Sequence, residues 1–266
     1  MRNFKKRTDV SEVPKIEEVS RTMTEARTVL APAQGNRFTY QTAVGQIIDV
    51  PVNQLRDNPL NARRVVSQAG LEELATSLRT RGQDTAALGY VDEEDNVCLI
   101  DGHRRLEASR IAGKETLRVE IRERPSNEQE LYLRSRSANT EREAQTPLDD
   151  ALSWKLLLEK KVFESQAALC RKVGLEPTLV SRTIGLADIP KAIIRMLSER
   201  PDLMNLRMLD AIKRYVDSAG EDATQALILE IDHNGLSSRD VDNRRKAAER
   251  GPIARQRSDH QTIKFE

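Results

Sequence analysis

The sequence predicts an α+β protein in which a small domain of mixed strands and helices precedes an all-helical domain with a helix-turn-helix. Short β-branched or alternating stretches, typical of strands, occur only before Pro125. Every periodic segment after Pro125 repeats at helical spacing, and two short helical segments flank a glycine near residue 174. We therefore expect domains at 37–124 and 125–250, with flexible tails at 1–36 and 251–266.

Composition indicates a polar globular protein. The 266 residues are 38% hydrophobic and 32% charged, and 43 basic against 42 acidic residues give a net charge of +1. Any affinity for DNA must then come from local clusters of charge. Cys98 and Cys170 lie far apart, which argues against a disulfide framework and a zinc site. Because no apolar run approaches the roughly 20 residues of a membrane span, we expect a cytoplasmic protein without a membrane partner.

The first domain alternates strands and helices. Ile47–Val52 is β-branched, whereas Leu71, Leu74 and Leu78 follow the spacing of one helix face. In chain order we expect a strand at 47–52, a turn at 57–59, a helix at 71–78 that stops near Gly82, a hairpin of strands at 86–91 and 97–100, a helix at 103–112 capped by Gly113, and a strand at 117–122.

The sequence of the second domain predicts helices only. They are expected at 126–137, 147–161, 165–173, 178–187, 190–199, 204–217, 221–232 and 237–249. The pair at 165–186 has the spacing of a helix-turn-helix, with Gly174 in the turn and Pro177 at the start of the second helix. An ordinary helical hairpin remains the alternative. The sole tryptophan, Trp154, is expected to anchor the core.

Polar residues of this pair are the candidate contacts with double-stranded DNA. On the second helix, Arg182 has the donors to bind guanine, and its neighbours can bond to bases or phosphates. The full set is Ser165, Gln166, Arg171, Lys172, Thr178, Ser181 and Arg182. The basic stretch 239–257 is a second candidate for backbone contact, although a solvated helix end explains it equally well.

A second motif lies where an apolar run passes into a helix, at Asp101–Ala108. Gly102 permits an anion to approach the backbone closely. Arg104 and Arg105 add positively charged guanidinium groups beside the free N–H groups at the start of a helix. This corner suits a phosphate or polyphosphate. The alternative is a plain strand-to-helix turn whose arginines pair with Glu107 or Glu120.

Five motifs together resemble the ParB family of plasmid and chromosome partition proteins, from about residue 45 to residue 200. They are Asn58-Pro59, the stretch 71–78 ending in Gly82-Gln83, the turn 101–108, the pair 139–142 and 147–151, and the helix-turn-helix. The resemblance implies a ParB/sulfiredoxin-like N-terminal domain that binds CTP with magnesium, and a helix-turn-helix that recognises a centromere-like site. It also implies a homodimer that CTP closes into a clamp, a nucleoid- or plasmid-associated location, and a ParA-type ATPase partner, which the basic N-terminal tail can dock.

Carried over by resemblance, the nucleotide-binding residues are Gly102, His103, Arg104, Arg105, Asn139 and Arg142, with Asn139 as the candidate magnesium ligand. His103 and Ala138 stand where the family has glutamates. Because a hard cation prefers oxygen ligands, we expect weak magnesium binding and at most weak CTP hydrolysis.

Other functions stay open. After Arg250 the sequence is a short polar tail, so either the helices at 204–249 supply dimer contacts or the protein is a ParB-like transcriptional regulator without CTPase activity. A phosphotransferase or a sulfiredoxin-like catalyst would share the first fold, but sulfiredoxin needs a cysteine beside the turn glycine, where Asp101 and His103 stand. A protein adaptor is the third alternative.

Overall fold

A five-stranded mixed sheet forms the first half of the molecule. The computed structural model describes residues 39–140 and 145–250, and those from Tyr40 onward belong to one compact unit. The strands are β1 (Ile47–Pro51), β2 (Leu55–Arg56), β3 (Ala87–Val91), β4 (Val97–Asp101) and β5 (Thr116–Ile121), in the order β1-β5-β3-β4-β2. β1 with β5 and β3 with β4 pair antiparallel, whereas β3 with β5 and β2 with β4 pair parallel.

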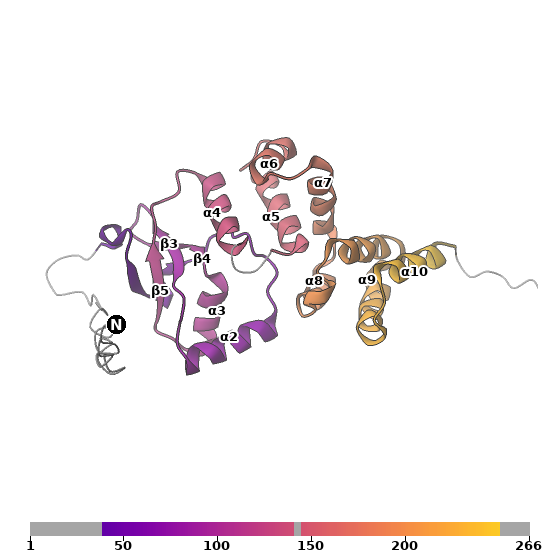
Figure 1. Cartoon of the computed structure of the whole chain (residues 1–266), viewed down its shortest axis with the longest axis horizontal. Helices are drawn as coiled ribbons and strands as arrows, with labels where there is room; N and C mark the ends of the chain where they lie inside the picture. Colours follow the sequence, from indigo (N-terminus) through magenta and orange to yellow (C-terminus); the bar gives the residue numbers. More distant parts are fainter. Residues whose placement is uncertain (1–38, 141–144, 251–266) are drawn as a thin grey trace, which may run out of the picture. The chain divides into compact units, whose positions relative to one another are not determined.

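Two helices cover the sheet in successive layers (Figure 1). Helix α3 (His103–Ala112) follows β4 directly and inserts Leu106, which is fully buried, into the strand core. Helix α2 (Gln68–Thr80) packs outside it, with Ala75 and Leu78 against Ala108. This core is aliphatic, as expected from the 3% aromatic content of the sequence.

All described residues after β5 that are regular are helical. The helices are α4 (Glu128–Thr140), α5 (Pro147–Glu159), α6 (Gln166–Val173), α7 (Pro177–Gly185), α8 (Lys191–Ser198), α9 (Leu206–Asn234) and α10 (Ser238–Arg250). Short 3-10 turns lie at Tyr40–Ala43, Val52–Gln54, Leu186–Asp188 and Pro201–Leu203. Thr146 and Asp149 form a capping box at the start of α5, with Pro147 in the first turn.

Helices α6 and α7 occupy the two segments predicted for the helix-turn-helix, with a turn between them. Gly174 adopts a φ of 71° at the end of α6, and its N–H bonds to the carbonyl of Cys170. The left-handed conformation costs little free energy at a glycine, so the chain can turn sharply here. Leu169 and Val180 seal the pair from inside and pack in one core with Trp154.

Most sequence expectations for the elements are confirmed. Trp154 is buried, and its indole N–H bonds to the hydroxyl of Tyr132 at 2.8 Å. Strand β2 was not expected, because two residues are too few for a periodic pattern. The helices expected at 204–217 and 221–232 are confirmed as the two parts of α9, which the non-helical Gly220 (φ 83°, ψ 176°) separates. The domain boundary at 124 stays a prediction, and the tails at 1–36 and 251–266 lie outside the described residues.

None of the helices in 39–140 and 145–250 is long and apolar enough to cross a membrane.

Candidate phosphate and nucleic-acid sites

The turn between β4 and α3 requires a glycine on two grounds. Gly102 has a φ of 108°, which residues with a side chain rarely adopt. A Cβ added there would lie 2.6 Å from the Cβ of Ala87 on the neighbouring strand β3. The backbone of the turn therefore packs directly on the sheet, and α3 begins without a capping side chain, an arrangement that favours an anion at the helix start.

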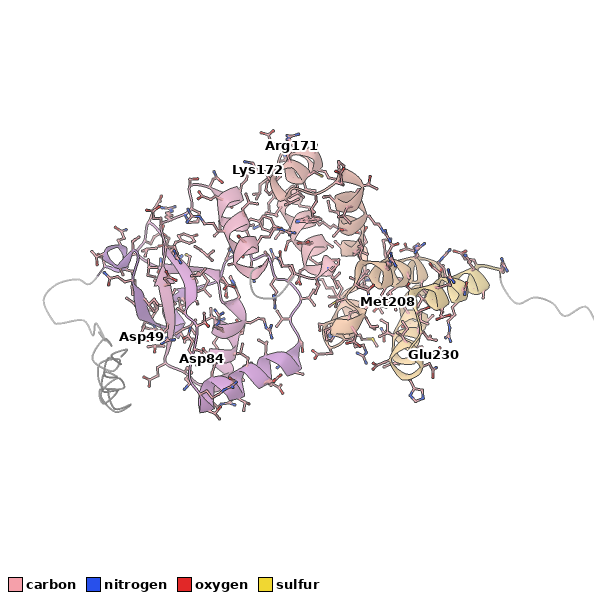
Figure 2. The ribbon with its side chains drawn as sticks, in the orientation of Figure 1. Asp49, Asp84, Arg171, Lys172, Met208 and Glu230 are labelled. Carbon is pink, nitrogen blue, oxygen red and sulfur yellow. The ribbon has the colours of Figure 1, made fainter. Side chains whose placement is uncertain are left out.

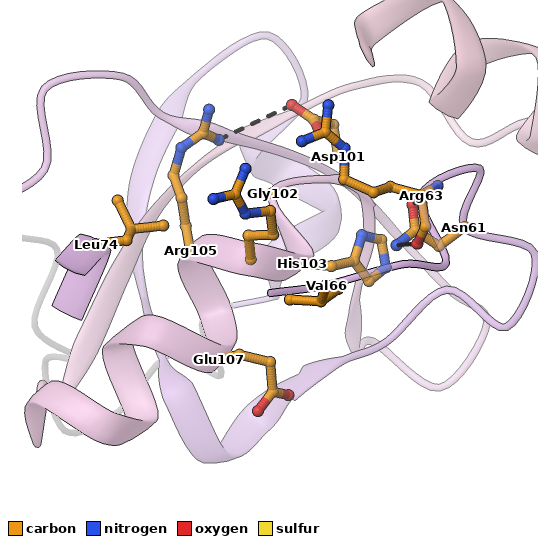
Figure 3. A pocket seen from close by; sticks show the side chains of 10 residues that line it. Asn61, Arg63, Val66, Leu74, Asp101, Gly102, His103, Arg105 and Glu107 are labelled. Carbon is orange, nitrogen blue, oxygen red and sulfur yellow. Dashed lines mark hydrogen bonds and ion pairs between the residues drawn. The ribbon is translucent and has the colours of Figure 1, made fainter. Parts of the chain in front are cut away.

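A pocket of about 410 Å³ opens at this turn (Figure 3). Three arginines and one histidine line it beside Asn61, Asp101 and Glu107: Arg63, His103, Arg104 and Arg105. Arg105 Nη1 lies 3.9 Å from the carboxylate of Asp101. Arg104 reaches the start of α2, since a Cβ on Gly70 would be 3.3 Å from its Nη2. The structure thus brings the four predicted phosphate-turn residues, 102–105, to one pocket.

The predicted pairing of these arginines with Glu107 or Glu120 is wrong. Glu107 pairs with Arg110 one turn further along α3, and Glu120 pairs with Arg122 at 2.9 Å. The sequence suggested Glu107 and Glu120 because of their spacing, but their carboxylates find closer neighbours. The strand-to-helix turn itself is present, as both interpretations required.

His103 is fixed at the pocket by a bond to a distant segment. Its Nε2 accepts a hydrogen bond from the backbone N–H of Asn58 at 3.0 Å. Burial lowers the pKa of the imidazole to about 4, against the smaller opposing effects of Asp57 and Asp101. The ring is therefore neutral near pH 7 and is held by this hydrogen bond.

The pocket includes residues that the sequence interpretation missed. Asn61 and Arg63 come from the segment between β2 and α2, and side chains of the helical half hold that segment. Asp149 Oδ1 accepts the N–H groups of Arg64 and Val65, each at 2.7 Å. The Asn58-Pro59 turn followed by basic residues was the local signal that could have indicated them.

Glu199, which follows α8, holds the next part of the same segment. Its carboxylate accepts bonds from the Ser67 hydroxyl and the Gln68 N–H, both at 2.7 Å. These bonds lower the pKa of Glu199. The start of α2 is thereby linked to the helical half of the molecule.

The metal and remaining nucleotide positions receive less support. Arg142 and the side chain of Asn139 lie outside the described residues. Ala138, at the end of α4, has no ligating group and lines a separate pocket. Within 39–140 and 145–250, no group of three or more His, Cys, Asp or Glu side chains is arranged to hold a metal ion.

The second candidate site is the outer face of α7. Thr178, Ser181 and Arg182 are exposed, whereas Val180 and Thr183 on the opposite face are buried. This division leaves a polar helix face open to solvent, as a groove-reading helix requires. The structure thus brings the three predicted α7 contacts together.

Arg182 is exposed but paired. Its Nη2 lies 2.8 Å from Asp210 on α9, and Arg214 lies 3.3 Å from the same carboxylate. Asp210 was not among the expected site residues, because a separation of 28 residues gives no sequence signal. Asp210 therefore competes with a base or phosphate for the guanidinium of Arg182.

Helix α6 contributes the remaining predicted DNA contacts. Ser165 caps the helix by accepting the N–H of Ala168, and Gln166 lies 3.5 Å from the carbonyl of Pro177 at the start of α7. Arg171 and Lys172 project from the far end of α6 into solvent (Figure 2). Ser165 and Gln166 thus also have structural roles, and all four residues stay predicted DNA contacts.

Comparison with known proteins finds its family match in the part of the chain that holds the sheet. Residues 37–136 match the model of the ParB N-terminal domain family. The "Probable chromosome-partitioning protein ParB" of Treponema pallidum is 29% identical over 146 residues, 55% of this chain and 44% of that protein. The "Nucleoid occlusion protein" of Bacillus cytotoxicus is 27% identical over 155 residues, 58% of this chain and 52% of that protein. The chain thus matches about half the length of these relatives.

Among solved structures, a C-terminally truncated chromosome-partitioning protein ParB from Caulobacter crescentus complexed with CTP-gamma-S aligns with 70% of this chain and 99% of that chain. Its sequence identity is 24% and its TM-score is 0.35. The same protein complexed to the centromeric parS site aligns with 75% of this chain and 98% of that chain, at 24% identity and a TM-score of 0.37. Residues 37–136, which hold the sheet and the turn described above, are therefore similar to ParB N-terminal domains.

Proposed function

We propose that the protein is a sequence-specific DNA-binding protein of the ParB type. One observation supports this proposal: α6 and α7 are two short helices joined by a turn at Gly174, and the second helix exposes Thr178, Ser181 and Arg182. Such a helix fits the major groove with its N-terminal residues toward base edges. The relationship to chromosome-partitioning and nucleoid occlusion proteins supports DNA as the partner.

The exposed residues suggest a division of roles. Arg182 reads guanine once its guanidinium leaves Asp210, while Thr178 and Ser181 bond to bases or nearby phosphates. Arg171 and Lys172 neutralise phosphates and contribute affinity that does not depend on sequence. With an overall charge of +1, specific binding depends on this local set.

A selected duplex and a scrambled duplex, titrated by fluorescence polarisation at one salt concentration, test the proposal. Arg182→Ala is expected to lose about 1–3 kcal/mol of discrimination between the two duplexes. Arg171→Ala should weaken both duplexes alike and reduce the salt slope by about one. Arg79→Ala, which removes an exposed arginine from α2, is the matched control and should leave both properties unchanged. Full discrimination in Arg182→Ala would exclude α7 as the reader.

The phosphate turn is the proposed site for CTP. Gly102 brings backbone close to the ligand, and the arginines of the pocket provide forked donors for phosphate oxygens. CTP bound there would gate a clamp formed by a homodimer on DNA. Calorimetry with CTP and with ATP tests the site, and equal or absent binding of the two nucleotides would exclude selection of CTP.

As a partition protein the chain would bind a centromere-like site and act with a ParA-type ATPase. The proposed docking arm is the basic tail at 1–36, which lies outside the described residues. Removing this tail should abolish stimulation of the ATPase while DNA binding persists. Stimulation that survives the deletion would place the contact elsewhere.

A further inference from the structure

The pocket at the phosphate turn presents donors and paired carboxylates. Asp101 lies beside Arg105, as the dashed line in Figure 3 shows, and Glu107 is bound by Arg110. A divalent cation such as Mg²⁺ needs several oxygen ligands and is usually held through carboxylates and phosphates. Both carboxylates that the described residues contribute to the lining, those of Asp101 and Glu107, already face an arginine. The chemistry of the described lining therefore does not fit a bound divalent cation.

His103 contributes a hydrogen-bond donor to the pocket rather than a metal ligand. Its Nε2 accepts a hydrogen bond from the backbone N–H of Asn58 at 3.0 Å. A neutral imidazole that accepts at Nε2 carries its proton on Nδ1. The pKa of about 4 keeps the ring in this neutral form across the physiological range. Nδ1–H is then the polar ring group that can meet a ligand in the pocket, which His103 lines.

A carboxylate at the same position would act in the opposite way. It would repel phosphate oxygens unless a cation stood between them. An imidazole N–H instead donates directly to an anion at the start of a helix, where the backbone also favours negative charge. Position 103 therefore decides whether a polyphosphate needs a metal.

We propose that the pocket binds a nucleoside triphosphate without a divalent cation, with His103 Nδ1–H and the pocket arginines holding the phosphates directly. This inference rests on the proposed function of the phosphate turn. It assigns His103 as a specificity-determining residue that sets the metal requirement of the site. The affinity of the protein for the nucleotide is then independent of magnesium.

Calorimetric titration of the full chain with CTP, in EDTA and in excess magnesium, tests this directly. The wild type should give dissociation constants within about threefold of each other. His103→Glu should bind at least about tenfold more weakly in EDTA, because its carboxylate repels the phosphates, and should recover in magnesium. His233→Glu introduces the same charge at an exposed position on α9 and serves as the matched control without such an effect.

The outcomes separate the two proposals. Wild-type binding that disappears in EDTA overturns the metal-free inference and leaves the nucleotide site intact. Absence of binding of both CTP and inorganic tripolyphosphate in either buffer overturns the nucleotide site itself and the inference with it.

The ¹⁵N shifts of His103 in the unliganded protein provide a readout independent of affinity. They should report the Nδ1–H tautomer at neutral pH, identified by comparison with His103→Gln. An Nε2–H tautomer would overturn the proposed donor.

Discussion

Gly102→Ala is expected to cost about 2–5 kcal/mol of folding free energy and to abolish CTP binding. Two contributions follow from the geometry. A φ of 108° forces alanine into a left-handed region that costs about 1–2 kcal/mol. The new Cβ would lie 2.6 Å from Ala87 Cβ and 3.2 Å from Ala87 Cα, and such overpacking costs about 1–3 kcal/mol. Relaxing the contact moves the turn and the pocket with it.

Gly113→Ala is the matched control, because Gly113 has a φ of 67° and an added Cβ meets nothing within 4 Å. This variant should lose only the free energy that the left-handed backbone conformation costs an alanine, about 1–2 kcal/mol. It should keep CTP binding. Adding Ala87→Gly to Gly102→Ala should recover part of the contact cost. Urea unfolding and calorimetry measure both properties. If Gly102→Ala proves as stable as Gly113→Ala, the close packing of this turn on β3 is refuted.

Three further outcomes are expected. Asp210→Asn frees Arg182 and should raise affinity for a selected duplex about two- to fivefold, the scale of an exposed ion pair; weaker binding in a polarisation titration would mean that Asp210 instead orients Arg182. The folded-state pKa of His103, about 4, lies below the ordinary 6.5, so the unfolded chain binds the proton first. The contribution of His103 to the free energy of unfolding should be complete above pH 6.5 and should decrease as the pH falls toward 4. Urea unfolding midpoints measured as a function of pH should show this decrease in the wild type and not in His103→Gln. The same decrease in both proteins would contradict the buried neutral ring. Trp154→Ala should cost about 3–5 kcal/mol by leaving a cavity; denaturation followed by circular dichroism measures this, and a loss below about 1 kcal/mol would show that the site is not a rigid core.

The sequence predicted the fold well where the signal is local. The helical spacing around Leu71 and the alternation at 117–122 each report a single buried face, which an amino-acid pattern records directly. The two-residue strand β2 has too few residues for any pattern. The separate helices expected at 204–217 and 221–232 are present as the two parts of α9, on either side of the non-helical Gly220.

The candidate sites were likewise predictable only where neighbouring residues in the sequence specify them. Gly102 and the α7 surface were found because a turn or a helix is specified by neighbours in sequence. The partner of His103 is 45 residues away, and the partner of Arg182 is 28 residues away. Such contacts are set by packing between elements, so no sequence pattern indicated the neutral ring or the Asp210 ion pair.

The central claim is that α7 contacts the bases of a duplex, and site-specific photocrosslinking tests it most directly. A photoreactive amino acid replaces Ser181 on α7 or, as a control, the exposed Asp49 on the edge strand β1. With a duplex selected for tight binding, position 181 should crosslink to bases within the recognised site, and position 49 should not. Crosslinking from position 49 with none from position 181 would contradict the account.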